Sequence, residues 1–198
     1  MRRNFILILA VMMIFTGAFG CATGKTVTRV SSDKITDLSG RWNDTDSQQV
    51  AQAIVTDCLA QPWLSVWKET NTGKPTVIVG RILNKSHEHI NVETFVKDIQ
   101  KSLINSQRVK FVSSSVERGD VRGERLQQHN GHTSEQTQAG AGQEIGAEFM
   151  MKGSLLTIPD EEGSTKVMWY QINVELHNIT STEIVWIGQH KIKKVIER

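Results

Sequence analysis

The chain has no marked excess of charge of either sign over its 198 residues. It contains 23 lysines and arginines against 21 aspartates and glutamates. Two of the basic residues, Arg2 and Arg3, precede a hydrophobic run, and beyond residue 20 the chain carries 21 residues of each sign. A nucleic-acid-binding surface needs several basic residues on one face to neutralise phosphates. Because the sequence has no basic run, we expect no nucleic-acid partner.

Long hydrophobic runs are also scarce, and the one present lies at the start of the chain. It is FILILAVMMIFTGAF, from Phe5 to Phe19. The run is shorter than the ~20 apolar residues of a typical membrane-spanning helix. It contains no acidic residue and follows Arg2 and Arg3, as the hydrophobic region of a secretory signal peptide does. We therefore expect residues 1–20 to be a signal peptide that is removed, with no membrane span elsewhere.

Cysteine is rare as well, and the first of the two cysteines follows the signal directly. Ala18 and Gly20 precede Cys21, as small residues do in the lipobox of bacterial lipoproteins. The sequence therefore predicts cleavage before Cys21 and its lipidation by acyl chains such as palmitate, which anchor a protein to a membrane. The alternatives are a plain secretory signal and an uncleaved anchor. Ala22, in place of Asp, resembles the outer-membrane pattern, so we expect an outer-membrane lipoprotein whose domain faces the periplasm.

Three segments follow from this interpretation. Residues 1–20 are the signal peptide, and residues 21–37 are a lipidated N-terminus and flexible tether, polar and without a repeating pattern. Fully extended, this tether reaches at most ~55 Å. Residues 38–198 are long enough for one globular domain with a hydrophobic core. Once Cys21 is acylated, Cys58 has no partner for an internal disulfide, and we expect it to be a buried core thiol.

Apolar residues at helical spacing predict helices in the domain. The first begins at Asp44 or Asp46 as N-cap and ends before Pro62. Its apolar positions are Val50, Ala51, Ile54, Val55, Cys58 and Leu59. After Pro62 we expect an apolar turn that packs on the core as a lid, formed by Trp63, Leu64 and Trp67.

Further helices are predicted over residues 92–105, 116–129 and, as a short one, 143–147. The helix over 92–105 has a clear set of residues for its buried side: Phe95, Val96, Ile99, Leu103 and Ile104. In the charged segment 116–129, we expect Val121 and Leu126 to point inward.

Five segments have the pattern of strands: 76–83, 109–114, 149–158, 167–179 and 183–195. The first is apolar on both faces, as a central strand covered by helices would be. The last three are separated by the turns PDEEGST and TST, which predicts an antiparallel meander. In its middle strand the alternation predicts one buried face, made by Tyr170, Ile172, Val174 and Leu176. The fold class is therefore α/β, of the α+β type: a single domain with a mixed, mainly antiparallel sheet of about five strands and helices packed on it.

Two glycine motifs in the sequence resemble nucleotide-binding loops. Gly140, Gly142 and Gly146 are spaced one residue too widely for a dinucleotide fingerprint and follow no strand. They belong instead to an exposed, mobile loop over 130–142. Residues 24–26, Gly-Lys-Thr, lack the upstream glycine and the strand of a P-loop. We therefore expect no cofactor and no small-molecule substrate.

Titratable residues do not form a convincing catalytic or metal site either. His87 and His89 flank Glu88 but provide only two imidazoles, whereas zinc takes three or four protein ligands. His129 and His132 could join them only if the fold brought them near. The pair Glu161 and Glu162 falls in a predicted turn, and no nucleophile elbow is present. The sequence thus predicts neither a metal site nor an enzyme.

The mature chain from about Leu38 resembles the LpoB-like family of lipoprotein activators of penicillin-binding proteins. The resemblance is carried by five landmarks: LSGRWNDTDS (Leu38 to Ser47), QPWL (Gln61 to Leu64), KPTVIVGRILNKSHEHI (Lys74 to Ile90), GAEFMMKGSL (Gly146 to Leu155) and EIVW (Glu183 to Trp186). It implies an outer-membrane lipoprotein, not itself catalytic, that docks on a class A penicillin-binding protein and stimulates peptidoglycan synthesis. Two features depart from the family: the tether is short and lacks proline, and Ser181-Thr182-Glu183 replaces the usual T-G-E turn.

Two other functions compete with this one. The first alternative is a structural or assembly lipoprotein of the cell envelope, related in fold to curli-secretion components. The second is an enzyme. The sequence does not assign the residues that bind a partner, but the loops 84–90 and 130–142 are candidates because loops on a rigid scaffold commonly carry recognition. Any exposed member of the five tryptophans would also favour a binding face.

Overall fold

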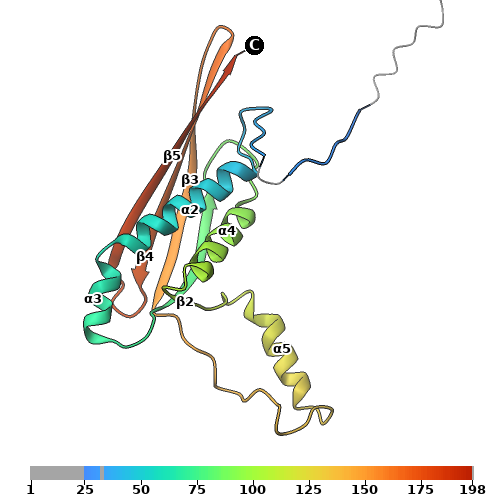
Figure 1. The fold of residues 1–198 in the computed structure, drawn as a ribbon, viewed down its shortest axis with the longest axis vertical. Coiled ribbons are helices and arrows are strands. Elements are labelled where there is room, and N and C mark those ends of the chain that lie inside the picture. The colour runs from blue at the N-terminus through green and yellow to red at the C-terminus, as the bar shows by residue number, and fades with distance from the viewer. Residues whose placement is uncertain (1–24, 32–33, 198) are drawn as a thin grey trace, which may run out of the picture. The chain divides into compact units, whose positions relative to one another are not determined.

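A computed structural model describes residues 25–31 and 34–197 (Figure 1). The predicted signal peptide, Cys21 and Gly24 lie outside the described residues. By its contacts the chain divides into two units, residues 1–34 and residues 35–198. In the first unit, residues 25–31 form no helix or strand. Within the described ranges, no helix combines the length and the apolar character needed to cross a bilayer.

The second unit is built on one five-stranded sheet. Its strands are β1 (Thr76–Asn84), β2 (Lys110–Phe111), β3 (Phe149–Glu162), β4 (Thr165–Asn178) and β5 (Ile184–Glu197). They lie in the order β2-β1-β3-β4-β5. β1 pairs in parallel with β2 and β3, whereas β3, β4 and β5 form the predicted antiparallel meander. The predicted α+β class with a mixed sheet is confirmed.

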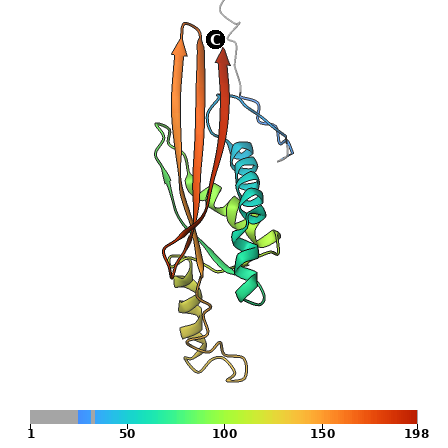
Figure 2. The same cartoon turned by 90° about the vertical axis from the view of Figure 1, so that its left-hand side faces the viewer.

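Two helices, α2 (Asp44–Ala60) and α4 (Val92–Asn105), lie together on one face of this sheet (Figures 1 and 2). The indole of Trp186 on β5 donates a hydrogen bond to Asp57 on α2, at 3.0 Å. The core between sheet and helices is apolar and nearly closed to solvent. Its fully buried side chains include Val50, Val55, Leu64, Val77, Phe95, Ile99, Leu103, Met151, Leu155, Tyr170, Ile172 and Leu176.

The alternation predicted along β4 is confirmed. Tyr170, Ile172, Val174 and Leu176 are all buried toward the helices. The residues between them point to the other face of the sheet, where Trp169 is 38 % exposed. Among the described residues no helix covers that second face (Figure 2). The sheet is therefore buried on one side and open on the other.

The start of α2 is capped by a different residue from the one predicted. Asn43 is the N-cap: its side chain accepts a hydrogen bond from the Asp46 backbone N–H, at 3.1 Å. Asp46 accepts one in return from the Asn43 N–H, at 2.9 Å. Asp46 is thus the third helical residue of a capping box rather than the cap itself, and Asp44 is the first helical residue.

The predicted turn after Pro62 is wrong, because residues Trp63–Thr70 form a helix, α3. Proline ends one helix but is also favourable at the start of the next, since its missing N–H would have no partner there. The Trp63 indole donates to the carbonyl oxygen of Cys58, at 2.6 Å. Cys58 is buried, as predicted, and burial raises the pKa of its thiol to about 12. The Cys58 thiol therefore stays protonated and unreactive.

The helix predicted over 116–129 is present as α5 (Arg118–Gln128), but it does not pack on the core. Val121 and Leu126 are exposed, contrary to the prediction. β2 spans only two residues, so the chain leaves the sheet early, and α5 projects from the body (Figure 1). Glu117, the residue before α5, accepts a hydrogen bond from Lys97 on α4. This bond lowers the pKa of Glu117 to about 2, so its carboxylate is charged and links the start of α5 to α4.

No helix forms over 143–147, which is a second correction to this region. Glu144 instead accepts two hydrogen bonds from Arg122, at 2.9 and 2.8 Å, and one from Arg125. These bonds, with Arg122 first, hold the pKa of Glu144 at about 2. The carboxylate therefore fastens the returning chain to α5.

The β3–β4 hairpin is longer than predicted. The segment Pro159 to Glu162, expected as part of a turn, continues β3, and the turn is made by Gly163 and Ser164. Gly163 has a φ of 60°, in the left-handed region that favours glycine. The hairpin and β5 extend beyond the helices (Figure 1).

Ile104, expected on the buried side of α4, is 47 % exposed, so this part of the prediction for α4 is wrong.

Candidate functional site

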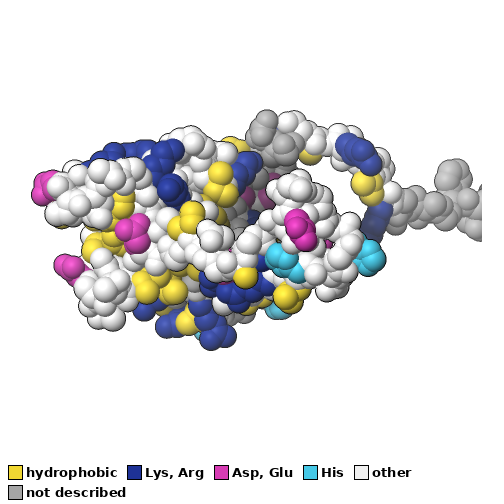
Figure 3. All heavy atoms as spheres, turned by 90° about the horizontal axis from the view of Figure 1, so that it is seen from below, with side chains coloured by type: hydrophobic (Ala, Val, Ile, Leu, Met, Phe, Trp, Pro, Cys, Tyr) yellow, Lys and Arg dark blue, Asp and Glu magenta, His cyan; other side chains and the backbone are white. Residues whose placement is uncertain are grey.

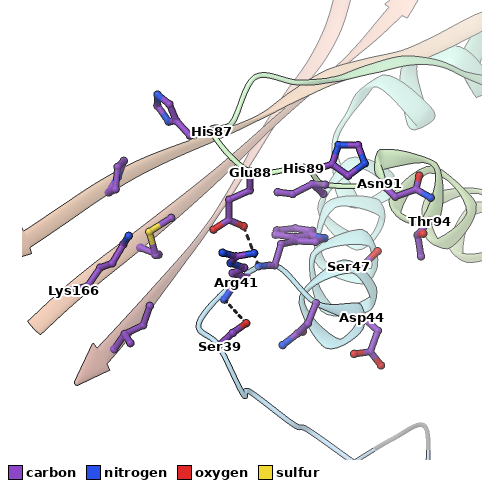
Figure 4. A pocket seen from close by; sticks show the side chains of 16 residues that line it. Ser39, Arg41, Asp44, Ser47, His87, Glu88, His89, Asn91, Thr94 and Lys166 are labelled. Carbon is purple, nitrogen blue, oxygen red and sulfur yellow. Dashed lines mark hydrogen bonds between the residues drawn. The ribbon is translucent and has the colours of Figure 1, made fainter. Parts of the chain in front are cut away.

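A groove of about 1020 Å³ opens where three segments of the domain meet (Figure 4). One wall is the segment Ser39 to Asp44 that leads into α2, and the second is the loop His87 to Asn91 between β1 and α4. The third comes from the far ends of β3, β4 and β5. The loop 84–90, one of the two predicted recognition loops, thus borders this groove.

Trp42, which lines the groove, packs against two aromatic side chains of the core. The ring of Trp42 lies 6.1 Å from that of Phe95, edge to face, and 5.7 Å from that of Tyr170. Phe95 comes from α4 and Tyr170 from the buried face of β4. Such tilted ring pairs stabilise by about 0.5–1.5 kcal/mol beyond the area they bury. Trp42 therefore attaches the segment before α2 to both layers of the fold.

Glu88 provides the polar contact at the same place. Both of its carboxylate oxygens lie 2.9 Å from the Tyr170 hydroxyl, which donates to them, and one accepts the Trp42 backbone N–H at 3.4 Å. Burial, and then this bond to a carboxylate, raises the pKa of Tyr170 well above its ordinary value. The hydroxyl therefore remains a donor at all physiological pH values. Glu88 is therefore a structural acceptor rather than a solvated loop residue.

The loop that carries Glu88 is itself fixed by side chains. Asn84 donates to the Glu88 carbonyl oxygen at 2.8 Å, and its own Oδ1 accepts the Ser86 backbone N–H at 2.9 Å. The His87 backbone N–H donates to the hydroxyl of Thr157 on β3, at 3.2 Å. Asn commonly makes such local bonds to turn backbone. The groove wall is therefore a rigid loop.

An ion-pair cluster closes the groove wall beside α2. Lys194 on β5 lies 2.7 Å from both Asp46 and Asp37, and it donates to the Arg41 carbonyl oxygen at 3.1 Å. The side chains of Lys194 and Asp46 are only 10 % and 8 % exposed. Burial lowers the pKa of Lys194, but the bonds with Asp37 and Asp46 outweigh it, and the net shift is upward. The lysine is therefore charged and holds β5 to the start of α2.

The groove rim can bind polar groups, but its residues do not form a catalytic set. His87 and His89 are exposed and point away from each other (Figure 4), while Asp44 and Lys166 stand on other walls. Within the described ranges no three His, Cys, Asp or Glu residues are placed to hold a metal ion. The half-buried carboxylate of Glu88, which lines the groove, is already occupied by the Tyr170 hydroxyl and the Trp42 backbone N–H.

The second predicted recognition loop, 130–142, lies elsewhere, beside α5 (Figure 1). Its end returns to that helix: His129 is bonded to Gln138 at 2.9 Å, and the Ala139 N–H donates to Gln128. The structure therefore does not bring His129 to His87 and His89. Glu161 and Glu162 lie on β3, where Glu161 pairs with Lys166 at 3.5 Å.

The Trp42–Glu88–Tyr170 set was not found from the sequence. Tyr170 lies 82 residues after Glu88 along the chain, and Glu88 lies 46 residues after Trp42. One signal was present: the chain has a single tyrosine, on the buried face of a predicted strand, and a buried tyrosine hydroxyl needs a hydrogen-bond partner. The identity of that partner depends on the tertiary fold.

Comparison with known proteins identifies a family to which the sequence is similar. The model of a protein family described as "Peptidoglycan-synthase activator LpoB" matches residues 46–192. The family consists of envelope lipoproteins that act as regulatory activators and are not enzymes. No curated protein is similar enough in sequence to count as a relative.

Several solved structures are similar at low sequence identity. The C-terminal domain of LpoB from Salmonella enterica is 17 % identical, with a TM-score of 0.44, and the match covers 75 % of this chain and 99 % of that domain. The corresponding domain from Escherichia coli is 16 % identical, with a TM-score of 0.43 and the same coverage. A lipoprotein from Neisseria meningitidis, GNA1162, is 12 % identical, with a TM-score of 0.37, over 61 % of this chain and 83 % of that one.

The family match includes α2 from Asp46 onward, the β1–α4 loop, and all of β3 and β4. It includes both Glu88, which lines the groove, and Tyr170, whose hydroxyl donates to it. The resemblance seen in the sequence landmarks is confirmed. Since the match extends over most of its length, this chain belongs to the LpoB family of peptidoglycan-synthase activators.

Proposed function

We propose that this protein is an outer-membrane lipoprotein, anchored through Cys21, whose periplasmic domain binds and stimulates a class A penicillin-binding protein. The observation that carries the proposal is the family match over residues 46–192. The groove chemistry agrees with it, because its buried polar groups bond to one another rather than stand ready for a substrate. The function of the domain is then to bind another protein.

The short tether limits how far the domain can reach from the outer membrane toward the synthase. Residues 21–37 reach at most ~55 Å when fully extended. They are polar, with no proline to stiffen them. The synthase must therefore extend from the inner membrane toward the lipoprotein, and we expect the partner to carry a domain that stands well away from its own membrane.

The direct test measures synthase activity. The full-length lipoprotein in detergent is added to each purified class A penicillin-binding protein of the host, and glycan polymerisation and cross-linking are followed. We expect one synthase to be retained by the tagged lipoprotein and to be accelerated in both reactions. If no synthase is retained or accelerated, the activator function is wrong.

Replacing Cys21 with serine tests the anchor separately. Each buried methylene contributes about 0.8 kcal/mol to membrane residence, and serine at this position would receive no acyl chain. We expect the C21S protein to leave the outer-membrane fraction almost completely, whereas a C58S protein should stay there. Fractionation and immunoblotting measure this. Unchanged membrane fractionation of C21S would contradict lipidation.

A further inference from the structure

The open face of the sheet carries a set of apolar side chains that nothing in the described chain covers. The strand register places Ile158, Trp169 and Lys193 in one row across β3, β4 and β5. The next row toward the hairpin contains Val167 and Val195, and the row on the other side contains Leu156 and Lys191. We call the residues of these rows that the argument uses the outer patch: the apolar residues Leu156, Ile158, Val167, Trp169 and Val195, with Lys191 and Lys193 beside them.

The apolar members of the outer patch are not needed to close the core. Ile158 and Val195 are each 59 % exposed, and Trp169 is 38 % exposed. Their neighbours on the inner face, such as Tyr170, already fill the space beneath α2 and α4. Contiguous exposed apolar residues with a polar surround mark interaction sites on soluble domains.

Trp169 has the features of an anchor residue. It stands in the middle strand of the meander, so its backbone is held on both sides. The ammonium group of Lys191 lies 5.5 Å from its ring centroid, which restrains the indole through a cation–π contact. Tryptophans in such positions contribute a disproportionate share of binding free energy in protein interfaces.

The basic and the acidic residues around the outer patch lie at different positions along the strands. Lys191 and Lys193 lie on the exposed side of β5 near Trp169, while Asp160 and Glu197 lie farther toward the hairpin tip. A view from the lower end of the molecule also shows hydrophobic and basic side chains at the surface (Figure 3). A partner that fits must therefore present carboxylates to the two lysines and a basic group toward the tip.

The groove is the less suitable of the two surfaces for a large partner. Its aromatic and carboxylate groups contact one another, as the Tyr170–Glu88 bond shows. The outer patch, in contrast, has apolar side chains that remain exposed to solvent, such as Ile158, Trp169 and Val195. Burying them on a partner removes apolar surface from water, which favours association.

We propose that the outer patch is the surface on which the synthase docks, and that the synthase contributes a recess for the Trp169 indole bordered by carboxylates that face Lys191 and Lys193. This inference rests on the proposed function. It goes beyond that function by naming the face, the anchor and the chemistry of the partner's surface.

The test uses the full-length lipoprotein and the synthase that it retains, with affinity and association rate measured by surface-immobilised binding. We expect W169A to weaken binding by about 10- to 100-fold, mainly through faster dissociation. The K191E/K193E double variant should associate more slowly, and its affinity should depend less on salt. Matched controls come from the opposite face: I104A and K101E on α4 should bind as the wild type does.

The outcomes separate the two claims. If the wild type binds no synthase, the proposed function and the docking surface both fail. If the wild type binds and both W169A and K191E/K193E bind equally well, only the docking surface is wrong. Should W169A prove unstable in a melting experiment, K191E/K193E decides alone. If sedimentation shows a wild-type dimer that W169A dissolves while synthase binding is unchanged, the patch joins two copies of this chain and the proposal is overturned.

Discussion

Replacing Lys194 with methionine is expected to destabilise the domain by about 3–5 kcal/mol, because it leaves Asp46 buried without its counter-ion. Methionine has nearly the length of lysine, so the change removes charge and little packing. Asp46 would keep one hydrogen bond, from the Asn43 N–H, but would lose the ammonium group 2.7 Å away. Denaturant unfolding of the purified protein, followed by tryptophan fluorescence, measures the loss.

Two further variants identify the cause. Lys193→Met, one residue away on the exposed face, should change the free energy of unfolding by less than about 0.5 kcal/mol. The double variant D46N/K194M should be more stable than K194M alone, because the asparagine carries no charge and can still accept the Asn43 N–H. A K194M protein as stable as K193M would show that the buried pair contributes nothing net.

The pH dependence of this effect follows from the direction of the lysine's pKa shift. The folded-state pKa of Lys194 is raised above its ordinary value of about 10.4. The stabilisation from its charge is therefore complete below about pH 10.4 and is lost as the pH rises through the folded-state pKa. We expect the gap between the wild type and K194M to stay constant from about pH 6 to about pH 9 and to shrink only in stronger alkali.

The sequence predicted those parts of the fold whose signal is local. Alternation along β4 and the helical spacing in α2 each reflect one element packing on one apolar layer, and both elements formed as expected. The wrong predictions about α3 and α5 have separate causes. Pro62 was interpreted only as a helix end, although it also starts α3. For α5, Val121 and Leu126 gave a helical pattern, but a pattern does not show whether a surface is available to pack against.

The candidate sites depend on contacts that no local pattern encodes. Glu88 meets Trp42 across 46 residues of chain and Tyr170 across 82. The outer patch depends on strand register, because a shift of one residue would move every side chain of β5 to the other face. The sequence therefore predicted which residues alternate along each strand, but not which of them share a row with Trp169.

Two glycines on the inner side of the sheet should be far less replaceable than their small size suggests. Gly153 on β3, Val174 on β4 and Gly188 on β5 lie in one row. A Cβ at Gly188 would overlap the Trp186 ring, and a Cβ at Gly153 would overlap the Asn173 backbone oxygen. We expect G188A to cost about 1–3 kcal/mol and G153A about 3 kcal/mol or more, because backbone cannot move aside without breaking the β3–β4 pairing.

A double-variant cycle with Trp186→Leu separates side-chain overlap from backbone overlap, using unfolding free energies from denaturant titration. Leucine removes the ring atoms that a Cβ at Gly188 would meet, so G188A should cost less in the W186L protein than in the wild type, giving a coupling energy of about 1 kcal/mol. G153A should cost the same in both, since its obstacle is the β4 backbone. Equal coupling of both glycines to Trp186 would contradict this distinction. It would mean that Gly153, Val174 and Gly188 shift together when a Cβ is added, and that the sheet beneath α2 is less tightly packed than its buried side chains imply.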